Sequence, residues 1–334
     1  MPVRFGHRRS EHEQSYNEAR KAGSMESLNR MATELVDEAI DFADELTIAV
    51  HALDGDAAVL DFGVEVPGAV EAGLLAAEIQ TAGLATVQTE LSEIAGAPLT
   101  HVELSTDHPA LGLLCSQKGG WEISLDGFEG LGSGPARALV AEEEIYSRVG
   151  YHDAADFAVL TVEADELPEQ DVASHVAELT GVPETAVFLP VYSTASVTGS
   201  VVAAARAAEL ASFRLSELGY DPISILSATG SAPVAPVADS EEAAIARTTD
   251  ALAYGGQVHL TVEEEFDRFD EIVSVAAEEY GHPLGEAFDD ADWDFAELPV
   301  EVFAPAQVTV DVLGGETHVF GDTHEDVLAE SFGL

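Results

Sequence analysis

The sequence predicts an α/β fold, with α+β as the alternative, arranged as two α/β domains side by side with a cleft between them. A chain of 334 residues is long enough for about two domains. Short apolar runs alternate with helical patterns, which is typical of strand–helix–strand units. Hydrophobic residues make up 46% of the chain in regular runs, so the high charge does not indicate disorder.

Residues 1–24 differ from the rest of the chain. Five of the 13 basic residues lie there, without a hydrophobic period. We interpret 1–24 as a disordered extension or an over-extended start of translation. The remainder, 25–334, is expected to form two intertwined α/β domains, beginning with a helix from Met25 to about Asp44.

The elements expected in the first half follow from apolar runs and their boundaries. Strands are expected at 47–51, 59–62, 85–91, 101–105 and 121–125, and helices at 74–81 and 110–116. His108 stands just before Pro109 and the second of these helices, so it is expected beside a helix start and not as a ligand. The glycines of 130–134 and Pro135 predict a turn into a helix whose free N–H groups face an anion, with a plain turn as the alternative.

The second half contains a predicted parallel strand–helix–strand unit. It comprises strand 157–162, helix 169–179 and strand 186–192, followed by the loop 193–200 of small residues ending in a capping serine. The next helix, 201–211, is almost entirely Ala and Val and is therefore expected to be buried. Later expected elements are strand 223–226, helix 241–254, strand 257–262, an acidic helical stretch at 265–280, a hairpin at 307–320 and helix 325–331.

Two segments resemble each other. Gly132-Ser133-Gly134-Pro135 is followed 28 residues later by Leu160-Thr161-Val162-Glu163. Gly230-Ser231-Ala232-Pro233 is followed 30 residues later by Leu260-Thr261-Val262-Glu263. We hypothesise two related α/β halves whose glycine-containing loops line the cleft; unlike strand order in the two segments would contradict it.

Composition excludes several classes of function. The net charge is −50, and the acidic residues are spread along the whole chain, which fits a protein working in molar salt, where the Debye length is about 3 Å. We therefore expect no nucleic-acid partner. The single Cys115 stands in an apolar run and is expected to be buried, and the 11 histidines lack ligand spacing, so no metal site is expected. Without a long apolar run we expect no membrane span and a cytoplasmic protein.

Arg206 and Glu209 are the charged pair within the buried helix. At positions i and i+3 they share one face. Arg206 would keep the Glu209 carboxylate ionised against desolvation, and an ionised Glu in a dry pocket can act as a general base for water. The alternative is a structural ion pair between helices.

Basic residues are so scarce after residue 24 that those among small residues stand out. Lys118, Arg137, Arg206 and Arg247 have this setting. We interpret these four as candidates for anion contacts or buried ion pairs.

Several motifs together resemble one family, the archaeal methenyltetrahydromethanopterin cyclohydrolases. The resemblance spans about Met25 to Leu334. The motifs that carry it are Thr106-Asp107-His108-Pro109-Ala110, Gln117-Lys118-Gly119-Gly120-Trp121, Gly132-Ser133-Gly134-Pro135-Ala136-Arg137-Ala138, Ala204-Ala205-Arg206-Ala207-Ala208-Glu209, and Ala228-Thr229-Gly230-Ser231-Ala232-Pro233 with the residues that follow to Asp239.

The resemblance implies a hydrolysis without metal or cofactor, in which the tetrahydropterin is the substrate. A methenyl-tetrahydropterin cation would be converted reversibly to its N5-formyl form, with Glu209 as the catalytic base and Arg206 as its support. It also implies a phosphate site between the two domains with its Lys at Lys118, and a homotrimer. We add Arg137 and Arg247 as anion contacts, and Ser133, Gly134 and Ser196 as substrate- or phosphate-binding residues.

Two other functions remain open from the sequence. The same hydrolysis could act on methenyl-tetrahydrofolate, or the protein could bind anionic pterins without catalysis, with Arg206 and Glu209 purely structural. Glu209→Gln distinguishes the second case, because it should abolish turnover and spare binding only if Glu209 is the base.

Overall fold

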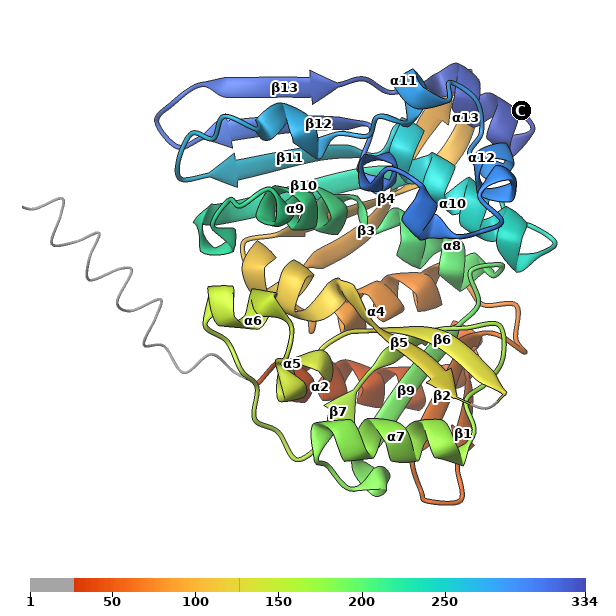
Figure 1. The fold of residues 1–334 in the computed structure, drawn as a ribbon. Coiled ribbons are helices and arrows are strands. Elements are labelled where there is room, and N and C mark those ends of the chain that lie inside the picture. The colour runs from red at the N-terminus through yellow and green to blue at the C-terminus, as the bar shows by residue number, and fades with distance from the viewer. Residues whose placement is uncertain (1–26, 126) are drawn as a thin grey trace, which may run out of the picture.

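The computed structural model describes residues 27–125 and 127–334, so the predicted extension at 1–24 lies outside the described residues. The fold is α/β, as predicted. Within the described ranges the strands form a seven-stranded sheet, sheet A, and a six-stranded sheet, sheet B (Figure 1). Sheet B lies at the top of Figure 1 and sheet A at the bottom, with helices between them.

Sheet A has the strand order β1-β2-β9-β8-β6-β5. Its strands are β1 (Ala49–Ala52), β2 (Ala58–Gly63), β5 (Gly119–Leu125), β6 (Phe128–Ser133), β8 (Thr161–Glu163) and β9 (Val187–Tyr192), with the short β7 (Ala158–Val159) also paired to β9. Strands β2, β9 and β8 are parallel, and β1, β6 and β5 are antiparallel to their neighbours. The predicted parallel unit is confirmed, because β8 and β9 are joined through helix α7 (Gln170–Thr180).

Sheet B has the strand order β13-β12-β11-β10-β4-β3. Its strands are β3 (Thr86–Ile94), β4 (Ala97–Thr106), β10 (Ile225–Pro233), β11 (Gln257–Val262), β12 (Gln307–Val312) and β13 (Thr317–Gly321). Only β11 and β12 run parallel, and the predicted hairpin at 307–320 is the antiparallel pair β12–β13.

The two sheets share a strand pattern. Along β5-β6-β8-β9 in sheet A the successive pairings are antiparallel, antiparallel and parallel. Along β4-β10-β11-β12 in sheet B they are the same. The two segments with similar sequences therefore have like strand order, as the hypothesis of related halves requires.

Helices connect the strands and cover the sheets. They are α2 (Leu28–Asp41), α3 (Ala43–Leu46), α4 (Val70–Gln80), α5 (Arg137–Val140), α6 (Glu144–Val149), α7, α8 (Val197–Ala204), α9 (Ala207–Glu217), α10 (Glu241–Gly255), α11 (Ala276–Glu279), α12 (Gly285–Asp290) and α13 (Glu325–Phe332). The π-helix η1 (Pro109–Gln117) and the 3₁₀ turns η2 (Glu184–Ala186), η3 (Pro222–Ser224), η4 (Phe269–Ile272), η5 (Phe295–Glu297) and η6 (Val300–Phe303) complete the elements.

Sheet A is buried on both faces, which explains the continuous apolar runs of its parallel strands. In β2, Leu60 packs with α2 and α4, whereas Val59 packs on the opposite face with α7. Sheet B follows the alternating pattern of a sheet with one covered face. In β11, Val258 and Leu260 are buried in the cluster that includes α9, and the intervening His259 is exposed.

Three connections carry the chain from one sheet to the other within the described residues. Helix α4 joins β2 to β3, η1 joins β4 to β5, and the pair α8–α9 joins β9 to β10. In Figure 1, α4, α8 and α9 lie between the sheets. Each sheet is consequently built from two separate stretches of chain.

Three predicted elements are wrong in detail. The buried helix 201–211 is two helices, α8 and α9, which break at Ala205 and Arg206. The glycine turn at 130–134 is mostly strand β6, because its backbone pairs with β5 and β8. The acidic stretch 265–280 is not one helix, since Phe269 and Ile272 form a 3₁₀ turn packed into the core beneath sheet B.

Candidate active site

The break between α8 and α9 places Arg206 and Glu209 together. The Arg206 guanidinium donates to Glu209 Oε2 through Nε at 3.1 Å and Nη2 at 3.0 Å. Glu209 is 1% exposed, and the Arg206 side chain is 18% exposed. The pairing predicted from the i, i+3 spacing is therefore present, on a carboxylate shielded from bulk water.

The surroundings of this pair favour the charged form of Arg206. Burial opposes the charge on the Arg206 guanidinium, but the carboxylate of Glu209, with Tyr192 and Glu163 nearby, outweighs it and raises the pKa of Arg206. Burial, followed by the charge of Glu163, raises the pKa of Tyr192 above its usual range, so its hydroxyl stays protonated.

Strand β10 approaches the start of α9 closely at Gly230. A Cβ on Gly230 would lie 2.5 Å from the backbone nitrogen of Ala208 and 3.1 Å from its Cα. Only glycine lets the strand lie this near the backbone that carries Arg206 and Glu209. The small-residue loop that the sequence singled out thus reaches the site through its glycine.

The other two connections bring amide side chains to the same region. Gln117, the last residue of η1, donates from Nε2 to the carbonyl oxygen of Ala205 at 3.4 Å. Gln80, the last residue of α4, has Nε2 within 3.2 Å of three hydroxyl oxygens, those of Ser133, Thr161 and Tyr192. The break in the third connection is therefore flanked by the ends of the first two.

Several buried oxygens in this region are unused. Oε1 of Gln80, Oε1 of Gln117 and Oγ of Ser212 make no hydrogen bond with any described residue. Ser212 stands one turn after Glu209 on α9. Buried polar atoms without partners are costly, so each calls for an explanation, and a polar ligand or a bound water would supply the missing partner. Neither glutamine was predicted as a site residue, although Gln117 stands in one of the motifs that carry the family resemblance.

Lys118 lies beside Glu143 and not free in a cleft. Its Nζ donates to Glu143 Oε2 and to the carbonyl oxygen of Gly119, both at 3.1 Å, and lies 4.9 Å from the centroid of the Phe213 ring. The Lys118 side chain is 16% exposed, so it is not fully enclosed by the fold.

Arg137 is bound within the fold, as the buried ion pair that the scarcity of cations left open beside an anion contact. Its side chain is fully buried, and its five N–H groups are taken by Glu143 and by the carbonyl oxygens of Ser116 and Lys118. The scarcity of cations identified Arg137 correctly as unusual, but its charge is used within the fold.

The small-residue candidates are also occupied by the fold. Ser196 caps α8, accepting from the N–H of Gly199, and the predicted cap at Ser200 is wrong because the helix begins at Val197. The N–H of Gly134 donates to the carbonyl oxygen of Ser116 and does not face an anion. Ser133 Oγ is buried in the hydroxyl cluster around Gln80.

Arg247 lies on α10 with few partners. Its Nη1 donates to the carbonyl oxygen of Pro236 at 3.5 Å, and the side chain is half-buried beneath the proline-containing loop 233–239. Among the described residues it makes no ion pair with a carboxylate, unlike Lys118, Arg137 and Arg206. Arg247 thus remains able to accept an anionic group.

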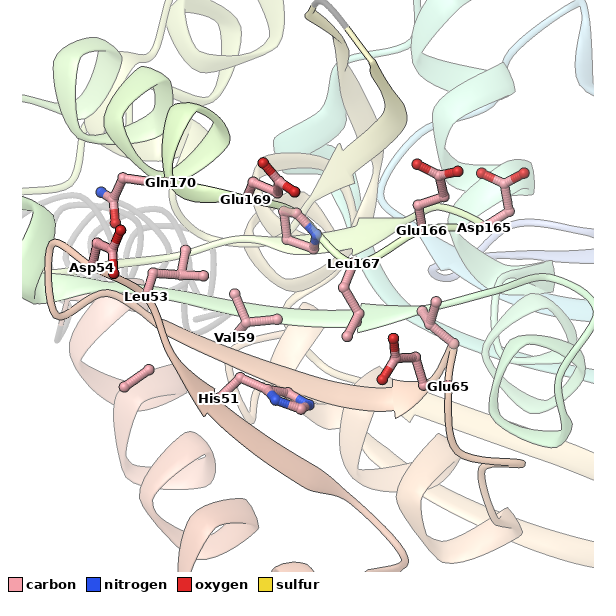
Figure 2. Close-up of a pocket in the computed structure, with 13 residues that line it drawn as sticks. His51, Leu53, Asp54, Val59, Glu65, Asp165, Glu166, Leu167, Glu169 and Gln170 are labelled. Atoms are coloured by element: carbon pink, nitrogen blue, oxygen red, sulfur yellow. The ribbon is translucent and has the colours of Figure 1, made fainter.

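A cavity lies elsewhere, beside sheet A. It has a volume of about 720 Å³ and is lined by the β1–β2 hairpin and the loop before α7, including His51, Glu65, Glu166 and Gln170 (Figure 2). None of the predicted site residues lines it. We locate the candidate active site at the α8–α9 break, because the paired charges and the unused amide oxygens gather there.

Two further findings concern the described residues. No three His, Cys, Asp or Glu side chains there could hold a metal ion together. None of the helices in that part of the chain is both long and apolar enough to cross a membrane.

Cys115 is buried as predicted, and burial raises the pKa of its thiol to about 12.

Comparisons with known proteins agree on one family. Residues 27–332 match the family model described as Cyclohydrolase (MCH). The chain is 58% identical over 310 residues to the methenyltetrahydromethanopterin cyclohydrolase of Halobacterium salinarum, covering 93% of this chain and 100% of that protein. The proteins of the same name from Methanocella arvoryzae and Methanothermobacter marburgensis are 41% and 39% identical, each over 93% of this chain and at least 99% of their own length.

Proposed function

The chain belongs to the methenyltetrahydromethanopterin cyclohydrolase family, and from that premise we propose that it catalyses the reversible hydrolysis of 5,10-methenyl-tetrahydromethanopterin to the 5-formyl compound. The observation that carries the assignment of the site is the pair at the α8–α9 break. A carboxylate that is 1% exposed and doubly hydrogen-bonded to an arginine is shielded from bulk water and fixed in direction, as a general base for water requires.

In this reaction Glu209 accepts a proton from water as the water oxygen bonds to the electrophilic methenyl carbon. The product is a neutral tetrahedral adduct and a protonated Glu209. The bond between that carbon and N10 then breaks, and N10 takes the proton from Glu209. The hydroxyl group of the adduct loses its proton to solvent, which leaves a formyl group bound to N5. The scheme uses only the substrate, water and side chains of the chain.

Arg206 holds the base in place during these steps. Its two hydrogen bonds to one oxygen, Glu209 Oε2, leave Oε1 as the oxygen to face the water. When Glu209 is protonated, Arg206 retains its charge, because a guanidinium is not deprotonated in proteins. The positive charge of Arg206 beside a protonated Glu209 favours return of the proton to the substrate.

Lys118 and Arg247 are proposed as contacts for the anionic part of the substrate. Lys118 directly follows Gln117, which contacts the α8–α9 break, and its side chain is partly exposed. Arg247 supplies a second cation without a carboxylate partner among the described residues. In a chain with a net charge of −50 and 13 basic residues, each such cation is a notable candidate for binding an anion.

We also propose, as finer points, a homotrimer working in the cytoplasm at high salt. The strongly acidic composition and the halobacterial relative support the salt environment. Light scattering in molar KCl tests the trimer, for which a monomer at all concentrations is the contrary result.

The decisive experiment follows loss of the methenyl chromophore in molar KCl. Methenyl-tetrahydromethanopterin and methenyl-tetrahydrofolate are offered separately to the unchanged protein, to Glu209→Gln and to Glu217→Gln, a control on the exposed side of the same helix. We expect turnover of the methanopterin substrate by the unchanged protein and the control, and a loss of about 10²-fold or more in Glu209→Gln. Equal rates in all three would remove Glu209 from the mechanism, and binding without turnover by the folded protein would indicate a pterin-binding protein.

A further inference from the structure

The segment Ser116–Gly120 touches the Arg206–Glu209 pair from one side. Gln117 Nε2 donates to the carbonyl oxygen of Ala205, the residue before Arg206. The backbone of Gly119 lies against the Arg206 guanidinium, because a Cβ on Gly119 would be 3.4 Å from Nη2. A shift of this segment would therefore move the groups that surround the base.

Arg137 holds the same segment from the other side. Its Nη1 donates to the carbonyl oxygens of Ser116 at 3.1 Å and of Lys118 at 2.5 Å. The guanidinium thus fixes two backbone carbonyls on either side of Gln117. Because the side chain is fully buried, its orientation is set by these bonds and by its carboxylate partner.

Glu143 binds two cationic side chains, those of Arg137 and Lys118. Its Oε1 accepts from Arg137 Nε and Nη2 at 2.9 and 2.6 Å, and its Oε2 accepts from Arg137 Nη2 at 2.8 Å and from Lys118 Nζ at 3.1 Å. Glu143 is the residue that directly precedes α6. Its carboxylate therefore joins the buried arginine to the accessible lysine.

Gly120 is required for this arrangement. A Cβ there would lie 2.8 Å from both Arg137 Cζ and Glu143 Oε1. Strand β5 can pass beside the ion pair only because Gly120 lacks a side chain. The pair and the segment are consequently fitted to each other and not merely neighbours.

We propose that Arg137 and Glu143 are positioning residues, a clamp that holds Gln117–Lys118–Gly119 in register with Arg206 and Glu209. The inference rests on the proposed function and extends it to residues that do not touch the substrate. Arg137 sets the backbone of the segment, and Glu143 sets the direction of the Lys118 ammonium group.

The clamp is charged across the neutral pH range. Burial raises the pKa of Glu143, but Arg137 and Lys118 outweigh burial and hold it below its usual range. The clamp therefore keeps its charge at neutral pH.

The test compares Glu143→Gln with Glu301→Gln. Both remove the charge of a partly exposed carboxylate bound to a basic side chain, with side-chain exposures of 27% and 34%. Glu301 pairs with Arg214, which also donates to the Glu271 carbonyl oxygen, and neither contact involves the segment. Turnover in molar KCl gives kcat and KM, and thermal unfolding gives Tm. We expect kcat to fall at least about tenfold in Glu143→Gln, since small misplacements cost this much, and less than about twofold in Glu301→Gln, at similar changes in Tm.

A rescue and a double variant separate positioning from folding. Glu143→Asp restores the negative charge and should recover part of kcat. If Glu143 acts partly through Lys118, then Glu143→Gln combined with Lys118→Met should lose less than the product of the two single losses.

Failure of the clamp proposal and failure of the proposed function give different results in these measurements. Turnover by the unchanged protein with equal kcat in Glu143→Gln and Glu301→Gln would overturn the clamp alone. A loss in Glu143→Gln that is independent of Lys118 and not recovered by Asp would also overturn it. No turnover by the unchanged, folded protein would overturn the proposed function and the clamp with it.

Discussion

Asp250 gives the protein a dependence of stability on pH that one substitution should remove. The residue lies on α10 and is 1% exposed. Its Oδ1 accepts from the N–H of Leu284 at 2.9 Å, and its Oδ2 accepts from Ser331 Oγ at 2.6 Å, which ties α10 to the turn before α12 and to α13. Burial raises the pKa of Asp250 from 3.8 to about 6, against the opposing effect of these two hydrogen bonds and of His282.

The direction in which stability changes with pH follows from whether the folded or the unfolded state holds the proton of Asp250. Between pH 3.8 and about 6 the unfolded chain ionises Asp250 while the folded protein keeps it protonated. The folded state then binds more protons, so stability falls as pH rises through this window and stays reduced above it. A difference of about 2.2 in pKa corresponds to about 3 kcal/mol, at about 1.4 kcal/mol for each pKa unit.

Asp250→Asn should therefore stabilise the protein at pH 7 to 8 by up to about 3 kcal/mol. The asparagine amide can keep both contacts, because its oxygen accepts from Leu284 and its nitrogen donates to Ser331. Urea unfolding in molar KCl, repeated from pH 4 to 8, measures the difference from the unchanged protein. Asp322→Asn, at an exposed position before α13, controls for the general removal of negative charge.

The difference between Asp250→Asn and the unchanged protein should shrink toward zero as pH falls to about 4, below the pKa of the folded state. An effect that is equal at every pH would refute the ionisation argument. So would a variant that is less stable than the unchanged protein at pH 8.

Four other outcomes are expected. Glu209→Gln should lower the free energy of unfolding by about 1–3 kcal/mol in urea, because Arg206 is left largely buried without its carboxylate, and an unchanged value would contradict this. Gly230→Ala should cost about 1–3 kcal/mol in the same measurement and also lower kcat, since its Cβ would meet the Ala208 backbone; normal stability and turnover together would be the contrary result. Arg247→Gln should raise KM about three- to tenfold at constant kcat, as loss of a partly screened charge contact would, whereas an unchanged KM would remove it from the binding site. Dilution from molar to about 0.1 M KCl should lower Tm, because the Debye length grows to about 10 Å and acidic self-repulsion returns, and a constant Tm would contradict that explanation.

The sequence predicted the parts of the fold that local pattern determines. Strands β9 and β11 and helix α10 agree with their apolar runs and caps to within one residue. The proximity of Arg206 and Glu209 was also predictable, because side chains three residues apart meet even where two helices join at a break.

The break itself could not be predicted. Between Val197 and Ala211 nearly every residue is small or apolar, so no period shows where one helix ends and the next begins. The break is stabilised by tertiary contacts, from Gln117 to the Ala205 carbonyl and from Gly230 to Ala208.

Arg137 shows a different limit. Arg137 stood out because basic residues are scarce in this chain. Its partner Glu143 is one of 63 acidic residues, and nothing in the sequence distinguishes it from the others. The burial that turns an expected anion contact into an internal ion pair depends on the packing of β5 against α5, which no local pattern encodes.

The three crossings between the sheets have a consequence for how this chain can be divided or recombined. Sheet A draws on 49–63 and 119–192, and sheet B on 86–106 and 225–321, so no single cut leaves either sheet whole and separate. Gln80, Gln117 and the Arg206–Glu209 pair each lie on or at the end of a different crossing. Exchange of one half between homologues would therefore exchange an incomplete set of site residues, and inheritance of the activity favours transfer of the chain as one unit.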